Sequence, residues 1–470
     1  MSVFQFSFYL VLAMATAAVA GCSGNDGSGS QDTLVVYSPH SEAIQQEFTR
    51  AFSEYYQEKT GRAVTIKWPD AGGSSGVLKQ LQDKQRQGIH DVDVLFGGGP
   101  IHSQLKAVGL LEPYRLGDDL LAKLPKTIAG EPLYDPDFTW YGAAISTFGL
   151  ITNRKLIADR GLSEVTQWMD MARPEFVGLV GVVDAAQSGS VRKAYDIMLQ
   201  AYGYAKGMRL LMLMAANARE IGASASDIPR GCAQGFVAVG PCIDFFAIRQ
   251  MLSPGGENLD FLLPEGLTVI NTDPVSILKG APHLDVAREF VTFVMSRRGQ
   301  RLWSLRQGTP GGPAETTLCR YAVLPEVYTD DAQYLATGLK SPFDAPPNTW
   351  YQQDKEDARI NILPAYLEKM MVENKRQLTE AWKAVIEAGA PEDLVARLTA
   401  PLVSEEEMLR LAREVWADVA VTETMTSEEK QAVEAEQDRR KRLRSDLKLQ
   451  WSEGFRTRYA EVLKAAKAKR

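Results

Sequence analysis

The sequence has few of the residues that metal binding and disulfide formation require. Only four of its 470 residues are cysteine and four are histidine, and they form no CxxC pair or Cys/His cluster, which argues against zinc. After Cys22 the cysteines are odd in number, so at least one thiol is unpaired within the chain. Cys232 and Cys242 bracket an expected strand that would hold them roughly 30 Å apart, too far for a disulfide.

Signatures of common enzymes and of nucleic-acid binding are missing as well. We identify no nucleophile elbow, HExxH motif, P-loop or pair of carboxylates at one strand end, so we expect no enzyme activity and no cofactor. The net charge is −7, and no basic patch with interleaved aromatic residues is present, which excludes a nucleic-acid partner. No internal repeat is visible, and 470 residues are too many for one compact core.

The first twenty residues are unlike the remainder. Residues 3–20 form a short apolar run that ends in Val19-Ala20-Gly21-Cys22, which is typical of a secretory signal and resembles a bacterial lipobox. We expect residues 1–22 to be a lipoprotein signal peptide, Cys22 to carry the lipid, and residues 23–32 to be a flexible tether in the cell envelope, facing the periplasm or the exterior. A signal with an incidental cysteine, or a membrane-spanning anchor, is the alternative. Residues 1–9 carry no Lys or Arg, unlike most signals.

The body begins as an alternation of strands and helices. Residues 34–37, 64–68 and 92–96 read as strands, each followed by a Gly- or Ser-rich turn and a helical pattern; Gly61 ends the first helix. This predicts a wound α/β sheet, which binds ligands at the carboxyl ends of its strands. Further strands are expected at 141–152, 179–183, 236–239 and 267–277, and a helix at 284–303.

The last third of the chain has another character. Residues 311–353 are rich in Pro, Gly and Tyr and look irregular, whereas residues from 356 onward look helical. Ser404 with Glu407, and Thr426 with Glu429, form expected capping boxes. The final helix has one apolar stripe, which predicts packing on the body; a helical arm that docks another protein is the alternative. The members of this stripe are Leu443, Leu447, Trp451, Phe455 and Tyr459.

Four segments suggest a known family. The runs VVYSPHSEAIQQEFTRAFSEYYQEKTG, DVDVLFGGG, VGLLEPY and VINTDPVSILKGAPHLDVAREFVTFVMSRRGQRLW resemble the ferric-ion-binding branch of the type II periplasmic binding proteins. The resemblance covers residues 33–310. It implies a type II α/β fold with two α/β lobes and a hinge of two crossing strands, here joined to an α-helical C-terminal extension. Lobe 1 would be residues 33–140 and 270–310, lobe 2 residues 141–269, and the extension residues 311–470.

The resemblance also implies where a ferric site would lie, and most of that site is missing. Iron-binding members use a His after the first strand, a Glu after the third, and two adjacent tyrosines in the second lobe. His40 matches the first position, but the Glu position falls in Gly97–Gly99, and the tyrosine pair falls on Ile243-Asp244 or Phe245-Phe246. We therefore predict weak or no ferric binding. A metal held by His40 and Asp244 is the weaker alternative.

The residues themselves favour a small polar, anionic ligand. A Ser-Gly-Ser turn that enters a helix offers hydroxyls, free backbone N–H groups and the positive end of the helix dipole. Ser188-Gly189-Ser190 has this form in lobe 2, and the turn before Ser74 and Ser75 has it in lobe 1. Each could instead be a plain helix cap. The full candidate set is Ser38, His40, Ser74, Ser75, Gly98, Ser188, Gly189, Ser190, Asp244 and Phe245. His90, His102 and His283 are predicted to lie on the surface.

These features favour an extracytoplasmic substrate-binding lipoprotein of an ABC importer. Its partners would be the ligand, the ABC permease and ATPase subunits, and the membrane through the lipid anchor. An iron(III) or iron–anion binding component is one alternative. A sensory or scaffolding lipoprotein without a transport role is the other.

Overall fold

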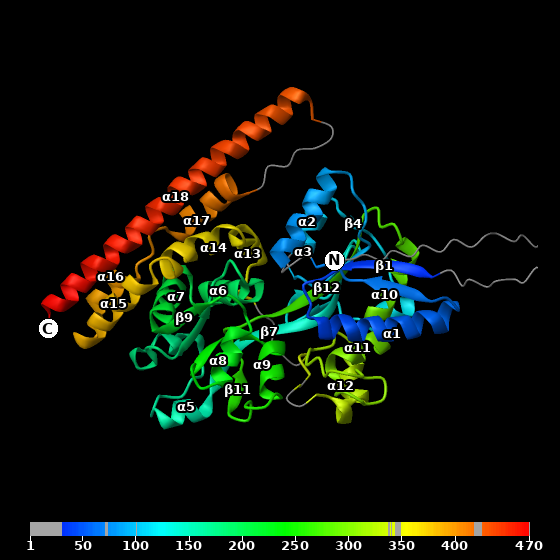
Figure 1. Cartoon of the computed structure of the whole chain (residues 1–470), viewed down its shortest axis with the longest axis horizontal. Helices are drawn as coiled ribbons and strands as arrows, with labels where there is room; N and C mark the ends of the chain where they lie inside the picture. Colours follow the sequence, from blue (N-terminus) through cyan, green and yellow to red (C-terminus); the bar gives the residue numbers. More distant parts are fainter. Residues whose placement is uncertain are drawn as a thin grey trace, which may run out of the picture.

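The computed structural model describes residues 31–70, 74–99, 101–336, 339, 341–343, 349–417 and 425–469, except the side chains of 74 and 75. The predicted signal peptide, Cys22 and residues 23–30 of the predicted tether lie outside these residues. The last residue of that tether, Asp32, is not flexible chain as predicted but begins β1. The chain folds into two α/β lobes side by side, with a helical extension along the outer flank of the second lobe (Figure 1).

Lobe 1 is built around the strand order β2-β1-β3-β12, in which β1 is parallel to β2 and β3. Gly61 ends α1 with a φ of 72°, a left-handed conformation that glycine adopts without strain. Its first elements are β1 (Asp32–Tyr37), α1 (Glu42–Thr60), β2 (Val64–Lys67), α2 (Ser74–Arg86), β3 (Val94–Phe96) and α3 (Ile101–Ala107). Smaller elements follow: β4 (Leu111–Glu112), α4 (Asp118–Leu121), β5 (Thr127–Ile128) and β6 (Glu131–Pro132).

Lobe 2 has the strand order β7-β10-β8-β9, with β11 paired to β7. Its core helices α6 and α7 are rich in buried Leu and Met and cover the sheet. The elements are β7 (Tyr141–Asn153), α5 (Arg154–Asp159), two 3₁₀ turns (Trp168–Ala172 and Pro174–Phe176), β8 (Val180–Val183), α6 (Gly189–Ala201), α7 (Tyr204–Asn217), β9 (Ala218–Gly222), α8 (Asp227–Ala233), β10 (Val239–Ile243), α9 (Asp244–Met251) and β11 (Leu259–Leu262).

Two strands join the lobes, as the sequence predicts. The first half of β7 pairs with β12 (Ile270–Leu278), whereas its second half pairs with β10 and β11 in lobe 2. β12 begins beside Thr147 and then pairs with β3 in lobe 1. All thirteen residues of β7 are buried, because the strand passes through both cores.

Three expectations differ from the structure. The strand expected at 236–239 begins at Val239 instead, and Cys232 lies in α8 rather than at a strand end. The argument from an extended chain between Cys232 and Cys242 was therefore wrong, although both cysteines and Cys319 are buried free thiols. The helix expected at 284–303 is two helices, α10 (Leu284–Met295) and α11 (Arg297–Ser304), because Ser296 is extended and caps the second.

The predicted boundary at residue 311 also differs from the packing. Leu318, Ala322, Leu324, Val327 and Tyr328 belong to the hydrophobic cluster of lobe 1, together with α12 (Glu326–Asp330). The 3₁₀ turn Ala332–Tyr334 follows. Lobe 1 therefore continues to about Phe343, which packs against the same cluster.

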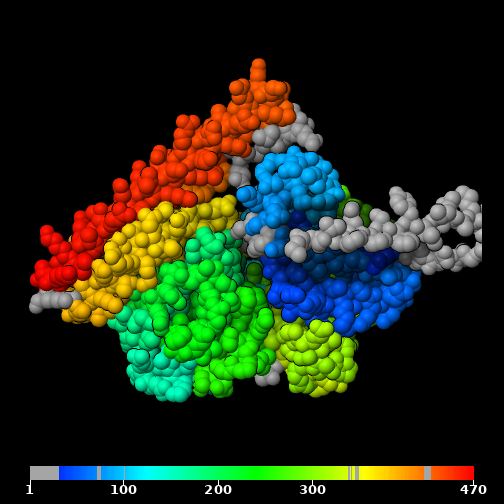
Figure 2. All heavy atoms as spheres, viewed as in Figure 1, coloured from blue at the N-terminus to red at the C-terminus, as the bar shows by residue number. Residues whose placement is uncertain are grey.

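From Trp350 onward the chain packs on lobe 2. The residues of this extension share one hydrophobic cluster with lobe 2, so the two form a single core. The extension lies along the outer side of lobe 2 (Figures 1 and 2). The elements are α13 (Gln353–Arg359), α14 (Ile362–Leu367), a π-helical turn (Glu368–Val372), α15 (Lys375–Glu387), α16 (Glu392–Thr399), α17 (Glu405–Leu411), a second π-helical turn (Ala412–Trp416) and α18 (Ser427–Ala468). Thr426 and Glu429 form the predicted capping box of α18, and Ser404 caps α17. Within the described ranges no helix has the length and apolar character needed to span a bilayer.

Candidate functional site

The chemistry-bearing residues of both lobes converge where β7 and β12 cross. His40 follows β1, Gly97 and Gly98 follow β3, and Asp273 lies on β12. The register of β12 against β7 shifts between Asp273 and Pro274. Proline cannot donate to a strand ladder, and such a bulge redirects the neighbouring side chain. The irregularity therefore places Asp273 at the boundary between the lobes.

Asp273 is the centre of a buried charged cluster. Its Oδ2 lies 2.9 Å from His40 Nε2 and accepts from Arg320 Nη1 at 2.7 Å, while its Oδ1 accepts from the Gly98 N–H at 2.9 Å. Burial alone would raise the pKa of the Asp273 carboxyl, but Arg320 and His40 hold it well below its usual range. Burial lowers the pKa of His40 despite Asp273, so its imidazole is neutral at pH 7.

Arg320 places a cation between the lobes. Its Nη2 donates to Ser146 Oγ on the hinge strand at 2.7 Å, and its guanidinium carbon lies 4.8 Å from the Phe245 ring centroid in lobe 2. The residue is 1% exposed, and its Nε has no hydrogen-bond partner. Arg320 thus links β12, β7 and α9 by charge, hydrogen bonding and a cation–π contact.

The glycines after β3 explain why no carboxylate stands at the family's third-strand position. Gly97 has a φ of 86°, and a Cβ there would lie 2.5 Å from His40 Nε2. A larger residue would push His40 away from Asp273. Gly98, with a φ of 101°, brings its N–H to the Asp273 carboxylate. This loop therefore supports the charged cluster around Asp273.

Asp244 is a hinge contact in this structure. The side chain is fully buried and accepts from the Thr147 N–H at 2.7 Å, from Thr147 Oγ1 at 3.1 Å and from the Phe245 N–H at 2.6 Å. Burial raises the pKa of Asp244 to about 6, although nearby Arg320 lowers it. Asp244 therefore joins α9 to β7 and has no direct contact with His40, while both lie near Arg320.

The start of α6 has the predicted form. Ser188 is the N-cap, and its Oγ accepts from the Val191 N–H at 3.3 Å and lies 3.2 Å from Ser190 Oγ. Ser188, Gly189 and Ser190 all remain partly exposed. The first N–H groups of a helix have no acceptor within the helix, so this turn offers donors to a ligand.

Arg192 adds a cation to this turn. The Arg192 guanidinium forms no hydrogen bond or ion pair within the described residues, and its Nε is buried without a partner, whereas the Arg192 backbone N–H donates to the Ser188 carbonyl at 3.0 Å. Burial lowers the pKa of Arg192, while Glu356 and Asp196 nearby raise it. Its neighbour Lys193 is instead fully engaged with Glu356 Oε2 at 2.5 Å and Tyr351 Oη at 2.9 Å. Arg192 is therefore the available cation at the start of α6.

Other predicted residues have structural roles or lie outside the described set. Ser38 Oγ donates to the Phe96 carbonyl at 2.7 Å and accepts from the His40 N–H, so it shapes the loop after β1. Ser74 and Ser75 begin α2, and their side chains are not among those described. His102 is buried, not on the surface as predicted, because its ring bridges Ser276 Oγ and the Gly97 carbonyl.

Sequence reasoning missed Asp273, Arg320 and Arg192. Asp273 lies in the expected crossing strand, and the proline that follows it was the available signal. Arg192 lies two residues after the predicted Ser-Gly-Ser turn, where a basic residue at a helix start opposes the dipole and is itself a signal. No local pattern indicated Arg320, which lies in a segment predicted to be irregular.

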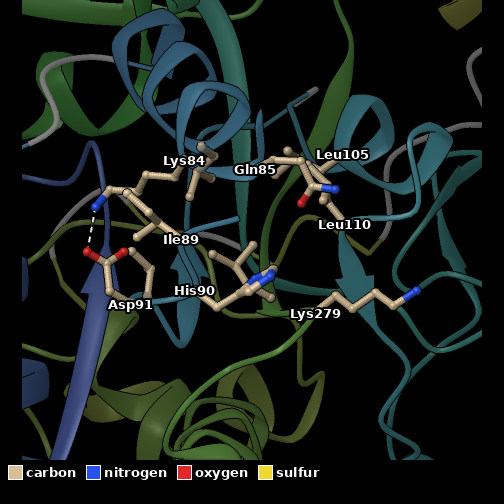
Figure 3. Close-up of a pocket in the computed structure, with 11 residues that line it drawn as sticks. Lys84, Gln85, Ile89, His90, Asp91, Leu105, Leu110 and Lys279 are labelled. Atoms are coloured by element: carbon tan, nitrogen blue, oxygen red, sulfur yellow. Dashed lines mark hydrogen bonds and ion pairs between the residues drawn. The ribbon is translucent and has the colours of Figure 1, made fainter. Parts of the chain in front are cut away.

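Two surface hollows lie away from this boundary. The first, of about 30 Å³, lies in lobe 1 between α2 and the end of β12, beside the pair Lys84–Asp91 and His90 (Figure 3). It has room for about one water molecule. The second, of about 320 Å³, lies beside α8 in lobe 2 and is lined by Arg219, Arg230 and Phe236. Neither includes a residue of the sites described above.

Comparison with known proteins agrees with this architecture. Residues 90–322 match the family described as bacterial extracellular solute-binding protein. An uncharacterized protein of Haemophilus influenzae is 26% identical over 296 residues, which cover 62% of this chain and 81% of that protein. The phosphoglycerate transport regulatory protein PgtC of Salmonella typhimurium is 27% identical over 233 residues, 49% of this chain. The match spans only 55% of the length of PgtC.

Solved structures share the fold at low sequence identity. The periplasmic binding protein AfuA of Actinobacillus pleuropneumoniae, with fructose 6-phosphate bound, superposes with a TM-score of 0.54 at 21% identity and covers 70% of this chain and 96% of its own. Iron-bound HitA of Pseudomonas aeruginosa gives a TM-score of 0.51 at 20% identity, covering 67% and 92%. At these identities, both similarities establish a shared fold only.

Proposed function

We propose that this chain, an extracellular solute-binding protein with the type II periplasmic fold, captures a small phosphorylated organic anion between its lobes for an ABC importer. The observation that carries the proposal is the start of α6, where the hydroxyls of Ser188 and Ser190 are followed by Arg192, whose guanidinium forms no ion pair or hydrogen bond within the described residues. Cys22, if lipidated, would hold the protein at the membrane that contains the permease.

The chemistry of this turn suits a phosphate group. Backbone N–H groups at a helix start and the helix dipole favour an anion, and two serine hydroxyls add donors. A guanidinium presents several N–H groups in a fixed plane, which matches phosphate oxygens by bidentate hydrogen bonding. The buried Nε of Arg192 without a hydrogen-bond partner is costly, and a bound phosphate would remove that cost.

Two of the similar proteins have names that agree with this ligand class. AfuA was solved with fructose 6-phosphate, and PgtC is named for phosphoglycerate transport. These names support a phosphate monoester as the ligand of this chain, and they do not indicate which phosphate monoester it is. The remainder of the ligand would face the hinge, where the Phe245 ring is only partly buried.

Ferric iron is the less favoured ligand. His40, the one residue that matches the iron-binding pattern, lies 2.9 Å from Asp273 and 3.0 Å from Arg320 Nη1. A metal bound by His40 would have to displace a fully buried guanidinium or stand beside its positive charge. No group of three His, Cys, Asp or Glu suited to a metal is found among the described residues.

Isothermal titration calorimetry tests the proposal. The wild-type chain is titrated with inorganic phosphate, 3-phosphoglycerate and fructose 6-phosphate. We expect at least one phosphate ester to bind, and Arg192→Gln to weaken it roughly 10- to 100-fold, because a charge-assisted hydrogen bond contributes about 1.5–3 kcal/mol. Arg219→Gln is the matched control, since Arg219 is an exposed arginine of lobe 2 that stacks on Phe236. Equal dissociation constants for wild type and Arg192→Gln would contradict the proposed anion-binding site at the start of α6.

A sensory role without transport is the second candidate, because PgtC is named a regulatory protein. The two roles differ in what the liganded protein does. A transport component stimulates ATP hydrolysis by its permease–ATPase complex in membrane vesicles. A sensory protein binds the same ligand without that effect.

A further inference from the structure

The chain separates its charges strongly along the sequence. Residues 439–470 contain twelve basic and three acidic residues, an excess of nine positive charges. The net charge of the whole chain is −7, so the preceding residues carry an excess of sixteen negative charges. A positively charged segment of this kind indicates a partner whose surface is negatively charged.

The excess of positive charge is carried by α18 from Arg439 onward and by the two residues after it, whereas the first twelve residues of the helix, Ser427–Asp438, contain five acidic residues and one basic residue. This helix buries Trp451, Phe455 and Tyr459 against the extension and turns its opposite face to solvent. At 100° per residue the exposed side chains on that opposite face form one stripe about 40 Å long. We call it the basic face; its cationic members are Arg439, Arg442, Arg456, Lys464 and Lys467, all exposed. Figure 2 shows α18 as one continuous outer edge of the molecule, orange to red.

Most of this charge is available to a partner. Arg442, Lys464 and Lys467 form no ion pair among the residues that the structure describes, and Arg456 lies 3.7 Å from Glu373. Arg439 alone on this face has a close pair, with Glu436 at 2.7 Å. Between residues 439 and 467, Asp446, Glu453 and Glu461 are the acidic residues on the basic face, so five cations outnumber three anions there.

We propose that the basic face of α18 binds an anionic phospholipid surface and orients the protein on its membrane. Each Lys or Arg near an anionic bilayer contributes about 1 kcal/mol, and a straight row of cations suits a flat surface of headgroups. Leu449, which is 64% exposed on the same face, can enter the headgroup region. The negatively charged remainder of the protein is repelled by the same surface, which fixes the orientation.

A protein partner fits these observations less well. Protein interfaces are enriched in aromatic residues and depleted in lysine at their centres. All aromatic residues of α18 point inward, and the basic face ends in Lys464 and Lys467. If this face binds a protein partner, the chain should not bind to vesicles that contain no protein. Binding to such vesicles therefore distinguishes a lipid partner from a protein partner.

Vesicle sedimentation with the full chain tests the inference. The vesicles contain phosphatidylcholine alone or with a third phosphatidylglycerol, at 50 and 500 mM NaCl. The test variant is Arg442→Gln/Arg456→Gln/Lys464→Gln/Lys467→Gln. The matched control removes four exposed lysines elsewhere, Lys79→Gln/Lys126→Gln/Lys155→Gln/Lys206→Gln. The N-terminal segment is the same in all proteins, and the neutral vesicles measure its contribution.

We expect wild type and control to prefer the anionic vesicles. The partition coefficient of the test variant into these vesicles should be at least roughly tenfold lower than that of the wild type. The preference should disappear at 500 mM NaCl because salt screens it. Equal binding to both vesicle types, equal loss in the control, or no binding of wild type would each overturn the proposal. Calorimetric binding of phosphate esters is unaffected in either case, so this test is independent of the proposed ligand.

Discussion

At the scale of single residues, Arg320 decides what the boundary between the lobes can bind. It neutralises Asp273, contacts Ser146 and lies over Phe245, although it comes from a part of the chain far from each of them in sequence. A buried ion pair stabilises only while both partners are present. This dependence can be measured directly.

Removing Arg320 should be far more costly than removing the pair. We expect Arg320→Met to lower the free energy of unfolding by about 3–5 kcal/mol at pH 7, because the Asp273 carboxylate, only 14% exposed, would remain largely buried without its cation. The double variant Arg320→Met/Asp273→Asn should recover part of this loss. Urea denaturation of the wild type, both single variants and the double variant gives the coupling energy. A double variant as unstable as the sum of the singles would show that the pair is not coupled.

Asp244 should make stability depend on pH in a defined direction. Its pKa is raised to about 6 by burial, so the folded state holds the proton more tightly than the unfolded state does. The free energy of unfolding should therefore fall as pH rises from about 4 to about 6, by at most about 3 kcal/mol from this group. Asp244→Asn should flatten that slope, whatever it does to absolute stability. An unchanged slope between these pH values would contradict the assignment.

At the scale of secondary-structure elements, α18 is part of the core of lobe 2. Trp451 stacks on Trp416 with centroids 5.5 Å apart, and Phe455 contacts Tyr366 at 5.4 Å. We expect Phe455→Ala to lower the free energy of unfolding by about 3–5 kcal/mol, and lobe 2 and the extension to unfold together. Leu449→Ala, on the exposed face of the same helix, is the control and should change stability little. Unfolding of the extension in a separate, earlier calorimetric transition would show that it is an independent module.

The sequence predicts elements with strong periodicity well and tertiary constraints poorly. The stripe from Leu443 to Tyr459 and the capping box at Thr426 place α18 correctly, because both are local signals. The strand before Asp244 was expected too early, because residues 236–238 are apolar but form the connection after α8. Residues 318–328 look irregular, yet they fill the core of lobe 1, and nothing local reveals Arg320.

In the candidate site, as in the fold, the sequence predicts the features that have local signals and misses those that depend on tertiary contacts. The sequence places the turn at Ser188 and the loop at His40 directly after strands, and both are there in the structure; that they bind a ligand stays a prediction. Their partners were not predicted, because Asp273, Arg320 and the unpaired state of Arg192 depend on segments that meet only in the folded chain. The sequence showed that glycines stand after β3 where iron-binding proteins have a glutamate, but not why. The structure gives the reason, because His40 packs so close to Gly97 that a side chain there would collide with it.

At the scale of the whole molecule, β7 and β12 are the strands that connect the lobes, and we expect the lobes to move about them. The charged cluster at Asp273 lies on these strands, and the proposed anion site lies in lobe 2, at the start of α6. A ligand that contacts both lobes favours the arrangement in which the lobes are close, and it shifts the population toward that arrangement.

Small-angle X-ray scattering tests this account most directly. The radius of gyration is measured for the wild-type chain alone and with a saturating phosphate ester identified by calorimetry, and the series is repeated with Arg192→Gln at the same ligand concentration. The account predicts that the radius of gyration of the wild type decreases on ligand binding and that the variant shows no decrease until far more ligand is added. A wild-type protein that binds the ester with an unchanged radius of gyration would contradict capture between the lobes.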